Sequence, residues 1–493
     1  MRRRRIVPGL LVLLASLGVP HMGGASVPNP IVEGPISGGI RGHAWNASLY
    51  DIAPYGYVEE EFFYGGLART RGPLAPIAAP YKSRMIVKRP ADPAAFNGTV
   101  IVEWLNVTGG TDLETVWPVA WEFLVRNGFA YVGVSAQLAG LCCGPLAPKG
   151  WDPLRYATIF HPGDEYSYDI FSQAMKALRD PLLNRTTIGT PKPVDPLGGL
   201  KLQHIAAGGA SQSASRLTSY INEGYDAEAG LVDVFNITRG GGPYDDLTTP
   251  ILQLNEEGQD ELPADNDRYR LWEEAGTSHA PAAWWNYIWA MQMRDAGTPS
   301  VPDAVTAACS TNRGSVDYSA RAGLWWTHHF LTTGELPPSI PRIERDADGS
   351  VRRDANGLAV GGMRHPFVQV PVAYNSGEGC PLWGLYKSWP AEKITALYAT
   401  HADYVSKVTA WAQSEVALGW LLPDDAADVI AKAEAFDGPW GDASCYDTYN
   451  ATGNEDGPLS SAVYDLSFDP SLPLGTQSAL RDVSCNALVP IGL

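Results

Sequence analysis

The segment from His204 to Arg216 contains the residue best suited to nucleophilic chemistry. It reads HIAAGGASQSASR, in which an apolar, strand-like run leads into small residues and then into a helical pattern. A serine at the tip of a strand–turn–helix connection needs small neighbours, because its backbone is strained and the helix passes close to the strand. Ser211 lies at that tip, with Gly209 two residues before it and Ser213, in place of the usual glycine, two residues after it. We predict that Ser211 is a nucleophile; the alternative is an ordinary helix N-cap.

The same turn predicts how a negatively charged oxygen would be stabilised. Unpaired N–H groups and the helix dipole favour negative charge at a helix N-terminus. The N–H of Gln212 would point at the oxyanion formed when Ser211 attacks a carbonyl. A second donor is expected from the glycine-containing turn at residues 106–110 (NVTGG), as the N–H of Val107 or of Thr108.

A serine nucleophile needs a base, and His279 has the best placement among the nine histidines. It follows the strand-like segment at residues 270–274, lies in a loop of small residues, and comes downstream of Ser211. His161, His365 and His401 are the competitors, but they follow a core strand less clearly.

The acid of a catalytic triad should follow the strand that lies between the serine and the histidine. Residues 249–255 (TPILQLN) form that strand and lead into Glu256, Glu257 and Asp260. Any of these carboxylates could hold the imidazole of His279. We favour Glu257, then Asp260, then Glu256.

The elements that must position these residues alternate between strands and helices. Strands are expected at residues 58–63, 83–87, 99–105, 129–135, 202–207, 232–238, 250–254 and 270–274, and helices at 116–126, 168–180 and 213–222. This pattern predicts an α/β fold with a mainly parallel central sheet flanked by helices, whose chemistry lies at the carboxyl ends of the strands.

The composition of the sequence and its pattern of elements change beyond residue 280. Trp284, Trp285 and Trp289 form an aromatic cluster, and residues 391–435 have a long helical pattern with a break expected at Pro423. We expect a core that bears the candidate catalytic residues at residues 30–280 and a tryptophan-rich, cap-like helical extension at residues 281–493. The tryptophans are expected either in a buried core or in a substrate pocket.

Charge and the N-terminal residues restrict the class of protein. The formal net charge of the 493 residues is -18, which disfavours binding to nucleic acids and to anionic membranes. Residues 1–25 combine a run of arginines with a short apolar stretch and small residues, as in a cleaved signal peptide. We therefore expect a secreted protein without stable membrane insertion.

The six cysteines do not form CxxC pairs, so no structural zinc site is expected. In an exported protein their even number suggests disulfide bonds. Cys142 and Cys143 are adjacent, so we expect each of them to pair with a distant cysteine rather than with its neighbour. The chemistry of a serine, a histidine and an acid needs neither a metal nor an organic cofactor.

The chain resembles the large, poorly characterised α/β-hydrolase domain family of secreted bacterial and fungal proteins. The matching segments are VEWLNVTGG (102–110), YVGVSAQ (131–137), HPGDEYSYDIFSQA (161–174), GASQSASRL (209–217), TPILQLNEEGQDE (249–261), RLWEEAGTSHA (270–280) and GGMRHPFVQVPVA (361–373). The resemblance covers residues 35–480 and implies an α/β-hydrolase fold with Ser211 and His279 as catalytic residues. Family members usually carry Glu-x-Asp in the acid loop, whereas Glu257 and Asp260 have one more residue between them.

These observations lead to one main functional expectation. A secreted serine hydrolase would cleave a small-molecule or lipid-like carboxylic ester through a Ser-His-acid triad and an acyl-enzyme. The alternatives are an acyltransferase or amidase that uses the same triad, or a non-catalytic binding protein on a hydrolase scaffold. The natural substrate and the oligomeric state are left open by the sequence.

Overall fold

The computed structural model describes residues 27–71, 77–186, 192–259, 262–298, 311–436 and 438–441. Several of the expectations fall on other residues. The signal peptide expected at residues 1–25, the candidate acid Asp260, and Cys309, Cys445 and Cys485 lie outside the described residues.

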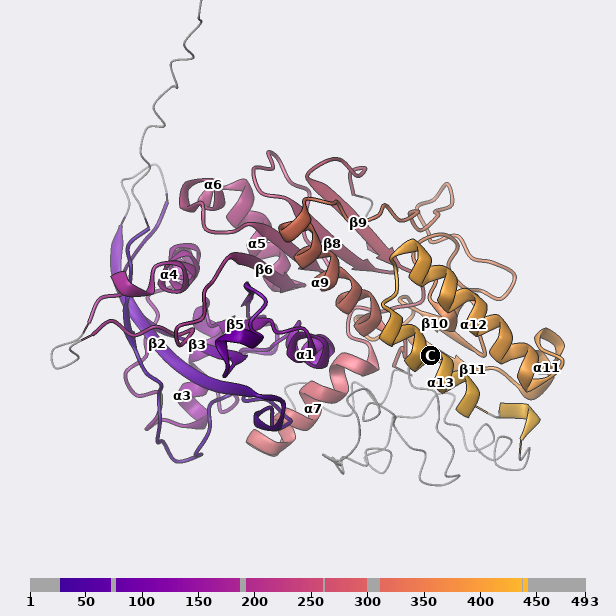
Figure 1. Cartoon of the computed structure of the whole chain (residues 1–493), viewed down its shortest axis with the longest axis horizontal. Helices are drawn as coiled ribbons and strands as arrows, with labels where there is room; N and C mark the ends of the chain where they lie inside the picture. Colours follow the sequence, from indigo (N-terminus) through magenta and orange to yellow (C-terminus); the bar gives the residue numbers. More distant parts are fainter. Residues whose placement is uncertain are drawn as a thin grey trace, which may run out of the picture.

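Within the described residues, a sheet of nine strands forms the centre of the fold, in the order β1-β2-β3-β5-β4-β6-β7-β8-β9 (Figure 1). Strands β1, β2 and β3 run antiparallel, and the strands from β5 to β9 in that order pair in parallel. The strands are β1 Ile31–Glu33, β2 Tyr57–Arg69, β3 Ala78–Pro90, β4 Thr99–Trp104, β5 Ala130–Val134, β6 His204–Ala210, β7 Val234–Thr238, β8 Ile251–Glu256 and β9 Tyr269–Glu274. The predicted α/β fold with its mainly parallel sheet is confirmed.

The central strands are apolar because helices cover both faces of the sheet. Strand β4 is buried along its whole length, and its alternate side chains enter different cores. Val100 and Val102 pack in one core with α4 and α5, whereas Ile101 packs in a second core with α1, α7 and α9. Trp284 and Trp285 of α7 belong to this second core and are 9% and 4% exposed.

The helices before residue 280 are α1 Trp117–Arg126, α2 Leu138–Leu141, α3 Pro148–Trp151, α4 Ser167–Arg179, α5 Gln212–Asn222 and α6 Tyr225–Ala229. Those after it are α7 Ala282–Ala296, α9 Val316–Thr333, α10 Pro366–Gln369, α11 Ala391–Leu397, α12 His401–Leu418 and α13 Pro423–Ala435. The helical stretch expected at residues 391–435 is thus broken before Pro423 and also before His401. In the described ranges, no helix has both the length and the apolar character of a membrane span.

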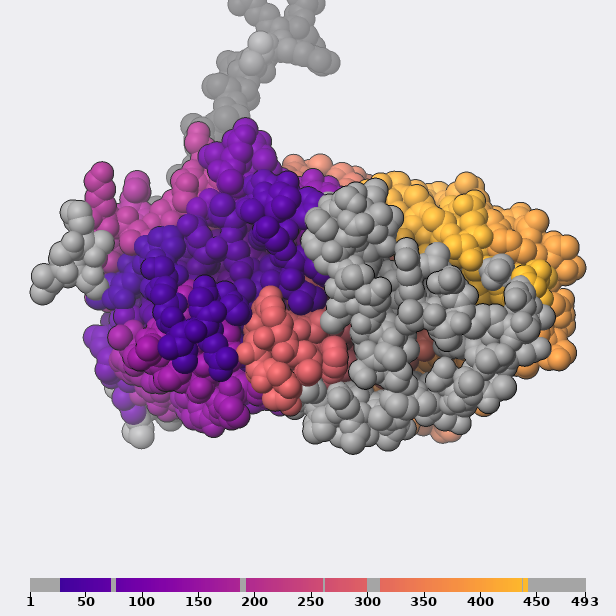
Figure 2. All heavy atoms as spheres, turned by 90° about the horizontal axis from the view of Figure 1, so that it is seen from below, coloured from indigo at the N-terminus to yellow at the C-terminus, as the bar shows by residue number. Residues whose placement is uncertain are grey.

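The chain after α9 packs against the edge of the sheet that β9 forms. Met363 makes a parallel bridge to Glu274, and its N–H donates to the carbonyl of Glu273 at 2.7 Å. A hairpin of β10 Ala373–Ser376 and β11 Leu385–Ser388 lies in this region, which has a hydrophobic core of its own. In Figure 1 it occupies the end of the molecule beyond β9, and Figure 2 shows it at the opposite end from the N-terminal strands.

Candidate active site

Ser211 is the single residue between β6 and α5. Its backbone has φ 58° and ψ -119°, and a residue with a side chain rarely adopts such a positive φ. The N–H of Ser211 is shared between the carbonyls of Thr238 and Arg239, at 3.2 and 3.1 Å. These bonds hold the strained turn in place at the carboxyl end of the sheet.

The small residues around the serine have identifiable roles. A Cβ atom on Gly209 would lie 3.0 Å from the hydroxyl of Ser213 and 3.1 Å from Leu217. Ser213, which replaces the usual glycine, is fully buried, and its hydroxyl lies 2.9 Å from both the N–H and the carbonyl oxygen of Ala210. The hydroxyl accepts from the first and donates to the second, so Ser213 ties the start of α5 to the end of β6.

His279 lies in the loop that follows β9, and its ring contacts a buried carboxylate. Nδ1 of His279 is 2.6 Å from Oε1 of Glu256, and the side chain of Glu256 is 2% exposed. Glu256 is the last residue of β8, and it also accepts from Nε2 of Gln259 at 2.6 Å. A carboxylate in this position selects the tautomer with the proton on Nδ1 and leaves Nε2 free to act as a base.

Glu257, the acid favoured from the sequence, contacts other groups. It accepts from the N–H of Gly276 at 2.8 Å, from Ser376 at 2.8 Å and from Arg353 at 2.6 Å. Successive residues at a strand end point to opposite sides, so only one of two adjacent carboxylates can face the imidazole. The geometry therefore replaces Glu257 with Glu256 as the partner of His279, although Glu256 ranked last among the three candidates in the sequence.

Arg239 connects the serine turn with the histidine loop. Its carbonyl accepts from the N–H of Ser211, and its Nη1 donates to the carbonyl of His279 at 3.2 Å. Burial lowers the pKa of Arg239, and the charges of Glu256 and Glu103 oppose that shift. Sequence reasoning missed this residue, although the glycines that follow it (RGGGP, 239–243) mark a turn directly after a strand. In the described part of the chain, no hydrogen bond joins the Ser211 hydroxyl to His279.

The turn expected to supply the second oxyanion donor lies against the segment that carries Ser211. Asn106 donates from Nδ2 to the carbonyl of Ala210 at 2.9 Å. The N–H of Val107 donates to Oε1 of Gln212 at 3.3 Å, whereas the N–H of Thr108 is used by the side chain of Asn106 at 2.8 Å. Val107 and Gln212 are thus brought together, and the bond of Val107 is the longer and more easily replaced one.

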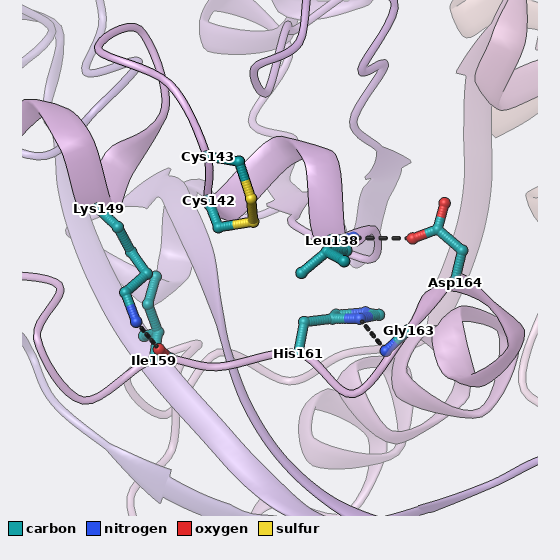
Figure 3. The surroundings of a disulfide bond; sticks show 8 residues. All are labelled: Leu138, Cys142, Cys143, Lys149, Ile159, His161, Gly163 and Asp164. Carbon is teal, nitrogen blue, oxygen red and sulfur yellow. Dashed lines mark hydrogen bonds between the residues drawn. A yellow bond between two sulfur atoms is a disulfide. The ribbon is translucent and has the colours of Figure 1, made fainter.

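Cys142 and Cys143 form a disulfide bond with each other (Figure 3). The expectation of two distant partners was wrong for this pair: the chain turns at Cys143, which has φ 86°, and so brings the two side chains together. Cys380 is also disulfide-bonded. The pair follows α2, whose first N–H, that of Leu138, donates to Asp164 at 2.9 Å.

The three competing histidines have other partners. His161 lies beside the disulfide loop in Figure 3, with Nε2 2.8 Å from the carbonyl of Ala136 and Nδ1 accepting from Gly163. Burial lowers the pKa of His161, which fits a neutral ring in this arrangement. His365 bonds to Glu415, and His401 to the carbonyl of Ala433. Of these four histidines, His279 is the one whose ring hydrogen-bonds to a carboxylate at the end of a parallel strand, Glu256 of β8.

A small cavity lies behind the ends of the parallel strands. Its volume is about 30 Å³, and Arg239, Glu256, Glu274 and Ser319 are among the residues that line it. This space accommodates one or two water molecules and is too small for an ester substrate. Among the described residues, no group of three or more His, Cys, Asp or Glu side chains is placed to hold a metal ion.

Comparison with known proteins decides the family. The family model described as "Alpha/beta hydrolase domain" matches residues 32–431. The chain belongs to the alpha/beta hydrolase domain family. This match confirms the resemblance to the α/β-hydrolase domain family that the sequence segments indicated. No curated protein matches it.

Several solved hydrolases share a distant likeness with this hydrolase domain. A cold-adapted esterase from an Arctic intertidal metagenomic library is 12% identical, with a TM-score of 0.28, over 52% of this chain and 99% of the other. A serine hydrolase without a lid from Xanthomonas campestris is 13% identical, with a TM-score of 0.25, over 47% and 90%. An esterase from Rhizomucor miehei is 11% identical, with a TM-score of 0.21, over 37% of this chain and only 43% of the other. The family match, and not these structures, assigns the fold.

Proposed function

We propose that the protein is a serine hydrolase that cleaves carboxylic esters, with Ser211 as nucleophile, His279 as general base and Glu256 as the acid that orients it. One observation carries the proposal: a buried carboxylate holds Nδ1 of His279 at 2.6 Å, at the carboxyl ends of the parallel strands, where Ser211 also lies on a strained turn. Strain of this kind and a base oriented by a third group are typical of activated nucleophiles. Glu256 takes the role first given to Glu257.

The reaction would proceed in two steps. Ser211 Oγ forms a bond to the ester carbonyl carbon while its proton passes to Nε2 of His279. The carbon–oxygen bond to the alcohol then breaks, and the alcohol leaves with that proton. Water, deprotonated by His279, attacks the acyl-enzyme and releases the acid and free Ser211.

The oxyanion of each tetrahedral intermediate would be stabilised by the N–H groups of Gln212 and Val107. Val107 must exchange its bond to the Gln212 side chain for one to the oxyanion, and the 3.3 Å length of that bond makes the exchange easy. Buried Arg239 supplies positive charge close to Glu256 and to the backbone of His279.

The experiment is a panel of p-nitrophenyl esters combined with labelling by a fluorophosphonate. We expect turnover of at least one ester and a label on Ser211, both absent from Ser211→Ala. Absence of both from the intact, folded protein would overturn the enzyme proposal and leave the non-catalytic binding protein. Amide substrates test the amidase alternative, and added alcohol acceptors test the acyltransferase alternative. An amidase would cleave the amides faster than the esters, and an acyltransferase would transfer the acyl group to the alcohol faster than to water.

We also propose that residues 1–25 direct secretion and are removed. The run of arginines, the apolar stretch and the small residues near position 25 support this. Expression in a bacterial host with an intact export system, followed by N-terminal sequencing of the protein in the periplasm or medium, tests the proposal. A protein that is retained in the cytoplasm with residues 1–25 attached would contradict it.

A further inference from the structure

Glu257 is a fully buried carboxylate in a loop, where carboxylates are usually exposed to solvent. Its side chain is 0% exposed, although it lies one residue beyond the end of β8. Both carboxylate oxygens are used: Oε2 accepts from the N–H of Gly276, and Oε1 from Ser376 and Arg353. A buried carboxylate with three donors, one of them a guanidinium, is a strong and directional anchor.

The anchor acts on the loop that carries His279. Gly276 is the second residue after β9, and its N–H bonds to Glu257 while its carbonyl accepts from Nδ2 of Asn312 at 2.9 Å. Asn312 Nδ2 also donates to the carbonyl of Ser376 at 3.1 Å. Gly276 itself is closely packed, since a Cβ there would lie 2.4 Å from Val368.

Arg353 gives this anchor its charge balance. It lies in the segment before α10 and bonds to Glu257, to the hydroxyl of Ser376 at 3.0 Å and to Glu378 at 2.8 Å. Glu378 is 47% exposed and does not bond to the histidine loop. The chain after α9 therefore reaches the histidine loop through Arg353 and Ser376, which bond to Glu257, and through the carbonyl of Leu382, which accepts from the N–H of Ala280 at 2.7 Å.

We propose that Glu257, paired with Arg353, is a positioning residue that fixes the loop of His279 so that the imidazole meets Glu256 on one side and Ser211 on the other. Two adjacent carboxylates thus have separate roles, since Glu256 orients the ring and Glu257 holds the backbone that bears it. The catalytic consequence rests on the proposed serine hydrolase function. The effect on the Glu256–His279 hydrogen bond does not depend on that function.

Glutamine cannot replace Glu257 without loss, although it has the same shape. A carboxylate offers only acceptors, whereas an amide turns one of its two heavy atoms into a donor. In Glu257→Gln the amide nitrogen would face either the N–H of Gly276 or the Arg353–Ser376 pair, and one side of the anchor would open. Displacements of about 1 Å in a catalytic geometry cost about 100-fold in rate.

The test compares Glu257→Gln with Glu378→Gln, a matched control that removes the other carboxylate of Arg353. Two readouts are used: kcat and KM for a p-nitrophenyl ester, and the far-downfield proton resonance of the short His279–Glu256 hydrogen bond. For Glu257→Gln we expect kcat to fall by about 10- to 100-fold with KM changed less than about 2-fold, and the resonance to shift or broaden. Glu378→Gln should keep the wild-type values of both.

A second variant covers the case in which Glu257→Gln does not fold. Glu257→Asp keeps the charge opposite Arg353 but is one methylene too short to reach Gly276 at the same time, so kcat should fall by about 10-fold. Wild-type kcat and an unshifted resonance in the folded variants overturn the positioning role. If the intact protein hydrolyses no ester, the resonance alone decides: a shift in Glu257→Gln or Glu257→Asp supports the role, and its absence overturns it.

Discussion

The turn at Ser211 and the loop at His279 both follow the carboxyl ends of parallel strands, β6 and β9, but different parts of the chain hold them in place. The serine turn is held by Ser213, which bonds to Ala210 three residues away, and by the carbonyls of Thr238 and Arg239 at the end of the adjacent strand β7. The histidine loop is anchored through Glu257 to Arg353 and Ser376, which lie 96 and 119 residues further along the chain. Residues of the parallel-strand core thus position Ser211, whereas the loop of His279 also depends on the region after α9.

This difference predicts how the two halves of the site respond to substitution. Changes at the serine should affect the chemistry and leave the rest of the molecule intact. Around the histidine, loss of the carboxylate that orients the ring should reduce activity most, and changes that only shift the loop should reduce it less. The following substitutions test that order, beginning with the largest effect.

Ser211→Ala should reduce kcat by about 10⁴- to 10⁶-fold, because the proposed acyl-enzyme forms on the Ser211 hydroxyl. Folding should be unchanged, since the Ser211 backbone and not its hydroxyl makes the bonds to Thr238 and Arg239. Ester turnover and the thermal unfolding midpoint are the measurements. Residual activity within about 10-fold of wild type would show that the nucleophile is elsewhere.

Glu256→Gln should reduce kcat by about 10³- to 10⁴-fold. The amide can donate to Nδ1 of His279, which would favour the wrong tautomer and place the proton on Nε2. The matched comparison is Glu257→Gln, whose expected loss is at least about 10-fold smaller. If Glu257→Gln is the more damaging of the two, the assignment of the acid returns to Glu257.

The identity of the carboxylate that contacts His279 could not be predicted from the sequence, although the strands themselves could. Strands such as β4 and β8 were predictable because buried parallel strands are continuous apolar runs. The sequence pattern places the end of β8 too early, at residue 254 or 255, whereas the strand continues to Glu256, which pairs with Glu274 of β9. Which of two adjacent glutamates faces the histidine depends on this register, and the register depends on a neighbouring strand.

Other contacts could not be predicted from local sequence patterns either, because they depend on the three-dimensional structure. Arg353 and Ser376 carry no signal that they contact the histidine loop, because their partner is distant in sequence. The Cys142–Cys143 disulfide was rejected because adjacent cysteines seldom pair, and only the turn at Cys143 reveals it. Ser211 and His279, in contrast, could be proposed from segments of a dozen residues.

Ser213→Ala tests how much the bonds between the start of α5 and the end of β6 contribute to holding the serine turn. The hydroxyl of Ser213 is buried and bonds to both polar groups of Ala210, so its removal should lower the free energy of unfolding by about 1–3 kcal/mol. We expect kcat to fall only a few-fold, because the bonds from Ser211 to Thr238 and Arg239 persist. Denaturant unfolding and ester kinetics measure the two effects. A loss of activity larger than that of Glu257→Gln would contradict the view that the turn is held by several independent contacts.

His365 offers the smallest test, and it concerns stability and the region that holds the histidine loop. Burial alone would lower its pKa, but the charge and hydrogen bond of Glu415 and the charges of Glu274 and Asp425 raise it from 6.5 to about 9. Burial raises the pKa of Glu274 from 4.5 to about 7, against the charge of His365 and the bond from Ser319. In both cases the folded state holds the proton more tightly than the unfolded state.

Stability should therefore fall as the pH rises, through Glu274 between about pH 4.5 and 7 and through His365 between about pH 6.5 and 9. The stabilisation from protonated His365 is fully present below its unfolded pKa and is lost as the pH passes the folded value. The unfolding midpoint of the wild type should thus drop from pH 7 to pH 9, and this drop should be smaller in His365→Gln. His329→Gln, at a more exposed histidine of α9, should keep the wild-type drop. An equal drop in all three proteins would show that His365 does not carry this pH dependence, and that the region behind the histidine loop is stabilised by packing rather than by its buried charges.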